Sequence, residues 1–139
     1  MKRLLFDVNV ILDVLLDREP HVEAGAAAWA TVETGVAEGL IAAHAVTTIY
    51  YLVQKEAGAA KARRTISALL KVFSVAIVDK DILREALDLP CPDFEDAVTA
   101  AAARHSGCDV VLTRDPRGFR GSLVPPMSPE AVLPLIPNI

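Results

Sequence analysis

Short apolar runs alternate along this chain with longer segments in which apolar residues recur every three or four positions. A short apolar run bounded by polar residues or glycine predicts a buried strand, and the longer period predicts an amphipathic helix. Four strands are predicted in this way, at residues 3–6, 40–43, 72–78 and 109–113. Residues 122–125 are predicted to form a fifth strand at an edge, because the two prolines that follow Val124 exclude a central position.

Helices are predicted between the strands, with local signals at several of their ends. Gly107 is typical of the left-handed residue that closes a helix, and Ser128 followed by Pro129 is typical of a helix start. The predicted helices cover residues 9–16, 21–36, 47–55, 59–71, 81–87, 93–105 and a short turn from 128. This alternation predicts an α/β fold with three layers, α/β/α, around a mainly parallel sheet of four to five strands. A chain of 139 residues is expected to form a single domain, 1–139.

Composition narrows the class of protein. Hydrophobic residues make up 53% of the chain and charged residues 23%, which excludes a disordered protein. No apolar run approaches the roughly 18 residues of a membrane span, and the run after Arg3 is too short for a signal peptide. Cys91 and Cys108 lack the spacing of a metal site, and we expect free thiols in a cytoplasmic protein.

Three aspartates stand where predicted strands or helices end or begin. Asp7 follows the first strand, Asp115 follows the fourth strand, and Asp96 opens an alanine-rich helix. Right-handed crossovers bring the carboxyl ends of parallel strands to one edge of the sheet, so the acids are expected to converge there. Two bare carboxylates 4 Å apart repel by roughly 4 kcal/mol at an effective dielectric near 20. A divalent cation would relieve this repulsion, so the pattern indicates metal-dependent chemistry.

Charge distribution adds a candidate substrate surface. The net charge of −4 does not suggest a nucleic-acid binder by bulk charge. However, Arg114, Arg117 and Arg120 surround Asp115, and a basic rim around an acidic centre suits a polyanionic substrate. A second basic group, Lys61 to Arg64, is more simply explained as a solvated helix face.

Three motifs resemble those of the PIN domain family, which includes the VapC-type toxin ribonucleases. They are Leu5-Phe6-Asp7-Val8-Asn9-Val10-Ile11-Leu12-Asp13, Pro92-Asp93-Phe94-Glu95-Asp96-Ala97 and Val111-Leu112-Thr113-Arg114-Asp115-Pro116-Arg117-Gly118-Phe119. The resemblance spans nearly the whole chain. It implies a compact α/β/α ribonuclease that uses Mg²⁺ or Mn²⁺ held by acidic residues. It also implies RNA as substrate, an antitoxin protein as a partner, a homodimer, and no membrane association.

Under this resemblance Asp7, Asp96 and Asp115 match the catalytic, metal-binding acids of the family. Asp93 lies three residues before Asp96, on a similar face of the predicted helix, and is expected to be a supplementary metal ligand. Two positions depart from the family pattern. Thr48 stands where many members have Glu, and Gly118 stands where many have Asp. The site is therefore expected to carry fewer charges than usual.

Several of these residues have simpler explanations that compete with the functional ones. Asp93 is well placed to cap the helix that contains Asp96. Asn9 would either orient a metal-bound water or cap the first helix, whereas Thr48 is expected mainly to begin its helix. Glu95 is expected to face solvent. Asp13 is expected to be a solvated or ion-paired acid, and His44 is expected to be a structural or surface residue.

Two other classes of function stay open at this point. A degenerate PIN domain would bind RNA or a protein partner without cleaving, which the residues at Thr48 and Gly118 favour. A receiver or haloacid-dehalogenase-like domain also has an aspartate after its first strand. The second class fits poorly, because Asn9 stands where a dehalogenase has a second aspartate, and Met1-Lys2-Arg3 provides no acidic pair.

Overall fold

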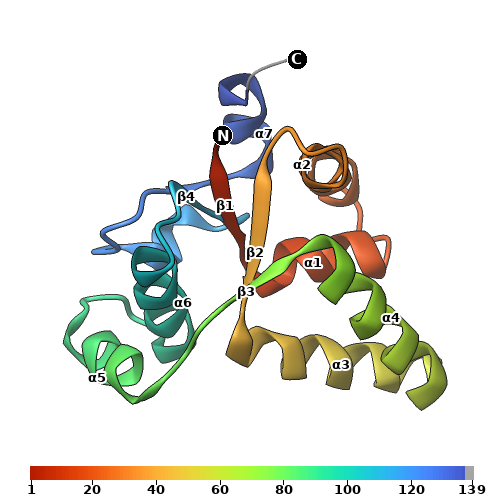
Figure 1. Cartoon of the computed structure of the whole chain (residues 1–139), viewed down its shortest axis with the longest axis horizontal. Helices are drawn as coiled ribbons and strands as arrows, with labels where there is room; N and C mark the ends of the chain where they lie inside the picture. Colours follow the sequence, from red (N-terminus) through yellow and green to blue (C-terminus); the bar gives the residue numbers. More distant parts are fainter. Residues whose placement is uncertain (137–139) are drawn as a thin grey trace.

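A five-stranded parallel sheet forms the centre of the computed structural model, which describes residues 1–136 (Figure 1). The strands are β1 (Arg3–Phe6), β2 (Glu38–Ala42), β3 (Ser74–Ala76), β4 (Val110–Leu112) and β5 (Pro126–Met127). Their order is β3-β2-β1-β4-β5, and every neighbouring pair is parallel. The predicted α/β fold with four to five strands is confirmed.

Helices cover both faces of the sheet. One face carries α1 (Val8–Leu15), α2 (Val22–Glu33), α3 (Ala43–Ala57) and α4 (Ala59–Val72). The opposite face carries α5 (Lys80–Asp88) and α6 (Phe94–His105), so the three layers are clear in Figure 1. The 3₁₀ turn η1 (Pro116–Phe119) follows β4, and α7 (Pro129–Val132) and the turn η2 (Leu133–Leu135) follow β5. None of these helices is long and apolar enough to cross a bilayer.

Alternating side chains of the central strands supply both cores. In β1, Leu4 and Phe6 pack with α1 to α4, whereas Leu5 packs with the alanine-rich face of α6. All three side chains are at most 1% exposed. A strand buried on both faces reads as a continuous apolar run, which is why the period-2 pattern is absent from β1. The polar residue that follows each such run therefore lies at the rim of the sheet.

Three predicted boundaries were wrong. The fifth strand is Pro126–Met127 rather than residues 122–125, because the Ser122 hydroxyl bonds to both the N–H and the carbonyl of Val124 and closes a turn there. Helix α3 begins at Ala43, directly after β2, and not at Thr47. The strand predicted at 72–78 is shorter and covers only Ser74–Ala76, because α4 includes Val72, the first residue of that apolar run.

Candidate functional site

The candidate site lies where the strand order reverses, between β1 and β4. After β1 the chain adds β2 and β3 on one side, whereas β4 and β5 lie on the other side. The connections therefore diverge between β1 and β4 and leave a crevice at the carboxyl ends of these two strands. Phe6 of β1 pairs with Leu112 of β4, and the backbone N–H of Asp7 donates to the Leu112 carbonyl at 2.8 Å. Asp7 and the residues after Leu112 therefore enter the crevice side by side.

Asp7 is the acid at the centre of this crevice, and it is 7% exposed. It caps α1, since its Oδ1 accepts from the Val8 N–H at 2.8 Å. Its Oδ2 accepts from the Thr113 hydroxyl at 3.0 Å. Burial raises the pKa of Asp7 from its usual range, while the hydrogen bonds from Thr113 and Val8 oppose that rise. The capping role excludes the alternative in which Asn9 caps this helix.

Thr113 ties two of the acids together. Its hydroxyl donates to Asp7 and accepts from the backbone N–H of Asp115 at 3.2 Å, and the residue is 1% exposed. Thr113 was not among the site residues predicted from the sequence. Its position offered a signal, because a hydroxyl directly after a buried strand and two residues before an acid can bond to the crevice groups of both strands.

Asp96 approaches the same crevice from the first turn of α6. Its backbone N–H donates to Asp93 Oδ1 at 3.1 Å, so Asp93 caps α6 as one of the two interpretations expected. Burial, followed by the negative charges of neighbouring acids, raises the pKa of Asp96 to about 7. Those neighbouring acids are Asp7, Asp93, Glu95 and Asp115. The predicted convergence of acids is therefore one cause, after burial, of the raised pKa of Asp96.

Gly118 keeps a small space open between two of these acids. A Cβ atom at Gly118 would lie 3.1 Å from Asp96 Oδ2 and 3.7 Å from Asp115 Oδ2. The two carboxylates therefore face the same space, although Asp115 itself is exposed. Any side chain at position 118 would occupy part of it.

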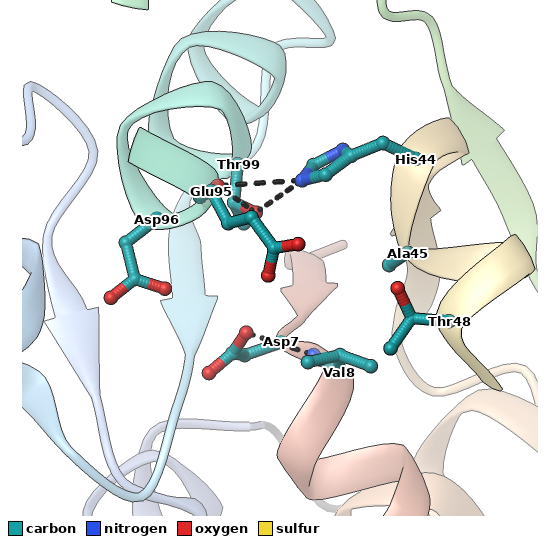
Figure 2. Close-up of a pocket in the computed structure, with 8 residues that line it drawn as sticks. All are labelled: Asp7, Val8, His44, Ala45, Thr48, Glu95, Asp96 and Thr99. Carbon is teal, nitrogen blue, oxygen red and sulfur yellow. Dashed lines mark hydrogen bonds between the residues drawn. The ribbon is translucent and has the colours of Figure 1, made fainter. Parts of the chain in front are cut away.

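A small cavity lies beside Asp7 and Asp96, between α1, α3 and α6 (Figure 2). Its volume of about 20 Å³ is enough for one water-sized occupant. It is lined by Asp7, Val8, His44, Ala45, Thr48, Glu95, Asp96 and Thr99. Thr48 lies in the second turn of α3, so the expectation that it begins the helix was wrong.

Glu95 was expected to face solvent, which is only half correct. The residue is exposed overall, but its carboxylate points into the cavity toward Asp7 (Figure 2). Its charge contributes to the raised pKa of both Asp7 and Asp96. Glu95 is therefore part of the acidic group, and the sequence analysis missed it because an exposed first-turn acid is ordinary in a helix.

His44 joins α3 to the beginning of α6. Its Nε2 lies 3.3 Å from the Glu95 carbonyl and 3.3 Å from Thr99 Oγ1, and the Thr99 hydroxyl also donates to that carbonyl at 3.0 Å. A carbonyl only accepts, so the Nε2 contact requires the proton on Nε2. The buried Nδ1 has no hydrogen-bond partner within residues 1–136. His44 is structural, as expected, and what it holds in place is the Glu95 backbone.

Of the three arginines predicted to bind substrate, one is held by an ion pair, and the other two form no ion pair within the described residues. Arg114 lies 3.5 Å from Asp13 Oδ1, and Arg18 lies 3.8 Å from the same oxygen. Asp13 is 1% exposed, so of the two expected states it is the ion-paired one. The charge of Arg114 also lowers the pKa of Asp7. Arg117 and Arg120 are exposed and form no salt bridge with the described part of the chain.

The donors in the crevice fit a hard divalent cation. Carboxylate and hydroxyl oxygens are the ligands that Mg²⁺ prefers, and this ion needs only one or two protein carboxylates because it keeps several waters. As they stand, no three His, Cys, Asp or Glu side chains of residues 1–136 are arranged to hold a metal ion together. The negative charge gathered around Asp96 nevertheless matches such an ion in sign, and the cavity beside it has room for one water-sized occupant.

Comparison with protein families decides the class. The sequence model of the PIN domain family matches residues 3–117. The chain belongs to the PIN domain family. PIN domains are generally nucleases and typically depend on divalent metal ions. No curated protein matches this sequence significantly.

Solved structures support the same fold for this PIN domain. A toxin–antitoxin complex from Klebsiella pneumoniae is 20% identical, with a TM-score of 0.68 over 90% of this chain and 96% of the other. DNA-bound VapBC from Salmonella typhimurium is 14% identical, with a TM-score of 0.69 over 93% and 99% of the two chains. FitAB bound to a DNA fragment is 19% identical, with a TM-score of 0.68 over 91% and 94%.

The family match excludes the receiver or haloacid-dehalogenase-like class, and the strand order also excludes a receiver. A receiver sheet has the strand order 2-1-3-4-5, whereas this PIN domain has 3-2-1-4-5. The crevice consequently lies between β1 and β4, which is where Asp7, Thr113 and Asp115 are found. The resemblance drawn from the three sequence motifs is confirmed.

Proposed function

We propose that this PIN domain is a ribonuclease that hydrolyses RNA phosphodiester bonds with Mg²⁺ or Mn²⁺. The observation that carries the proposal is the repulsion at Asp96. Burial and then the charges of four other carboxylates raise its pKa, and no cation of the described chain is paired with it. A divalent cation at this point would stabilise the charged form of every acid in the crevice.

Asp7, Asp96 and Asp115 would hold the ion. Asp93 would support them from the cap of α6, through its hydrogen bond to the Asp96 backbone. A bound ion supplies the lowered pKa of an attacking water and a clamp on the phosphate oxygens. Thr113 keeps Asp7 and Asp115 in register for this task, since its hydroxyl contacts both residues.

The substrate surface would be the basic group after β4. Arg117 and Arg120 are exposed and unpaired within the described chain, so they are free to neutralise phosphates of RNA. Arg114 is held by Asp13 and would bind at a fixed position close to Asp7. Substitution of Arg117 or Arg120 by Gln should weaken RNA binding most at low salt, where phosphate contacts contribute most.

A role as the toxin of a toxin–antitoxin pair is the finer part of the proposal. It is supported by the structural neighbours, which are toxin–antitoxin complexes from Klebsiella pneumoniae, Salmonella typhimurium and other organisms. In that role the chain would have an antitoxin as partner, would act on RNA in the cytoplasm, and would form a homodimer as the sequence resemblance suggests.

A second candidate function is RNA or protein binding without cleavage. It is favoured by the two neutral positions in the crevice, because Thr48 and Gly118 contribute no charge to an ion. Where RNA is the bound partner, the two functions differ in whether that RNA is cut.

Cleavage of RNA with Mn²⁺, combined with titration calorimetry of Mn²⁺, separates these possibilities. We expect the wild type to cut RNA and to bind Mn²⁺, and Asp7→Asn to lose both. Asp88→Asn, an exposed aspartate at the end of α5, is the matched control and should keep both. If the wild type binds Mn²⁺ and RNA but does not cut the RNA, the second candidate is supported. Equal Mn²⁺ affinity for the wild type and Asp7→Asn would reject the metal site.

A further inference from the structure

The cavity beside Asp7 contains a carboxylate that the three-aspartate site does not use. Glu95 is the second residue of α6, and its side chain descends into the space between Asp7 and Thr48 (Figure 2). Within residues 1–136 this carboxylate has no hydrogen bond and no ion pair. It lies in a wall of the cavity without any group to balance its charge.

Ordinary helix stabilisation does not explain the direction of this side chain. An acid in the first turn interacts favourably with the helix dipole while it is fully solvated. Glu95 instead points into a cavity that Asp7 and Asp96 also line, so three carboxylates of like charge face one small space. An arrangement that costs electrostatic energy in the free protein is expected when a cation compensates it.

The backbone that carries Glu95 is held firmly. Its carbonyl accepts from Thr99 within α6 and lies at hydrogen-bond distance from His44 of α3. These contacts fix the first turn of α6 against the beginning of α3, across the cavity. Only the side chain of Glu95 is then left to adjust, which is the geometry expected of a ligand that reaches an ion from a rigid element.

We infer that Glu95 is a further ligand of the metal site, direct or through one water, and that it completes the site from α6 opposite the neutral Thr48. The inference rests on the proposed function, because it concerns the same ion. It adds a fourth carboxylate to Asp7, Asp96 and Asp115. It also assigns a purpose to His44 and Thr99, which position the turn that bears Glu95.

Thr48 provides a rescue position. It lines the same cavity from α3, so a carboxylate introduced there would enter the space that Glu95 reaches from α6. Glu23 provides a matched control. It is exposed and is the second residue of α2, as Glu95 is of α6, so its substitution by Gln removes the same charge from the same position in a helix.

Titration calorimetry of Mn²⁺ on the wild type, Asp7→Asn and three further variants tests the inference without any activity assay. Glu95→Gln should weaken Mn²⁺ binding by about 10- to 100-fold, the usual range when a supporting metal-site group is lost. Glu23→Gln should match the wild type. The double variant Thr48→Glu/Glu95→Gln should recover most of the lost affinity. Far-ultraviolet circular dichroism of each variant confirms that it is folded before titration.

The outcomes separate this inference from the proposed function. If Glu95→Gln binds Mn²⁺ as tightly as Glu23→Gln does, while Asp7→Asn does not bind it, Glu95 is not a ligand. The proposed metal site is then still supported. Loss of affinity in Glu95→Gln without rescue by Thr48→Glu overturns the placement of Glu95 opposite Thr48. A wild type that does not bind Mn²⁺ at all overturns both.

Discussion

The raised pKa of Asp96 predicts that this carboxylate destabilises the metal-free protein at neutral pH. The substitution Asp96→Asn removes the charge while it keeps the shape of the side chain. In the wild type the pKa of Asp96 is about 7, compared with an ordinary value of 3.8. Between these two values the folded protein binds more protons than the unfolded chain, so the free energy of unfolding falls as the pH rises.

The size of the effect follows from the shift. A difference of this size corresponds to about 4 kcal/mol at 1.36 kcal/mol per pKa unit. Asp96 is only partly buried, so solvent screening reduces the effect, and we expect about 2 kcal/mol. This loss begins near pH 4 and is complete slightly above pH 7. Asp96→Asn lacks this loss and should therefore be more stable than the wild type at pH 8 by about 2 kcal/mol.

Urea unfolding with EDTA at pH values from 4 to 8 measures this difference. The stability gap between Asp96→Asn and the wild type should widen with pH and then level off. Asp81→Asn, an exposed first-turn acid of α5, should show no such widening. Saturating Mn²⁺ should reverse the order at pH 8, because the ion stabilises only the wild type. A gap that is constant from pH 4 to pH 8 would refute the raised pKa of Asp96.

Two further substitutions test the supports around the site. Thr113→Val should lower the free energy of unfolding by about 1–3 kcal/mol in EDTA, because both Asp7 and the Asp115 N–H lose a buried partner; urea unfolding at pH 7 would contradict this if the loss is under about 0.5 kcal/mol. Asp13→Asn should lower the free energy of unfolding by about 1–3 kcal/mol. This is less than the roughly 3–5 kcal/mol of a fully buried pair, because Arg18 and Arg114 are partly exposed. An unchanged urea unfolding curve would show that these ion pairs contribute nothing to stability.

The layered architecture and the position of the three aspartates were predictable from sequence for a shared reason. Strands buried on both faces leave apolar runs that end abruptly, as the run before Asp7 does. Once the strands are parallel, the acids after β1 and β4 must meet at one edge. Boundaries were less predictable where local hydrogen bonds compete with pattern, as at Ser122, whose turn displaced the fifth strand to Pro126–Met127.

Side chains that act across elements were not predictable. Thr113, His44 and Glu95 each have ordinary local explanations, as a strand end, a helix residue and a first-turn acid. Their importance comes from contacts over long separations in the chain, such as Thr113 with Asp7 and His44 with the Glu95 carbonyl. A single sequence carries no period or spacing for such contacts. The direction of the Glu95 side chain within its helical turn became visible only with the neighbouring helix in place.

The neutral residues in the crevice determine where its negative charge can be. At Gly118 the missing side chain lets the carboxylates of Asp96 and Asp115 face one space, and a Cβ at 3.1 Å from Asp96 would already crowd it. At Thr48 the absence of charge leaves the cavity wall of α3 neutral, while Glu95 enters from α6. Replacing Thr48 by Glu in the wild type would add a fifth acid to a group that already contributes, together with burial, to the raised pKa of Asp96. Thr48 and Glu95 are thus complementary: the charge that one wall lacks is present on the other.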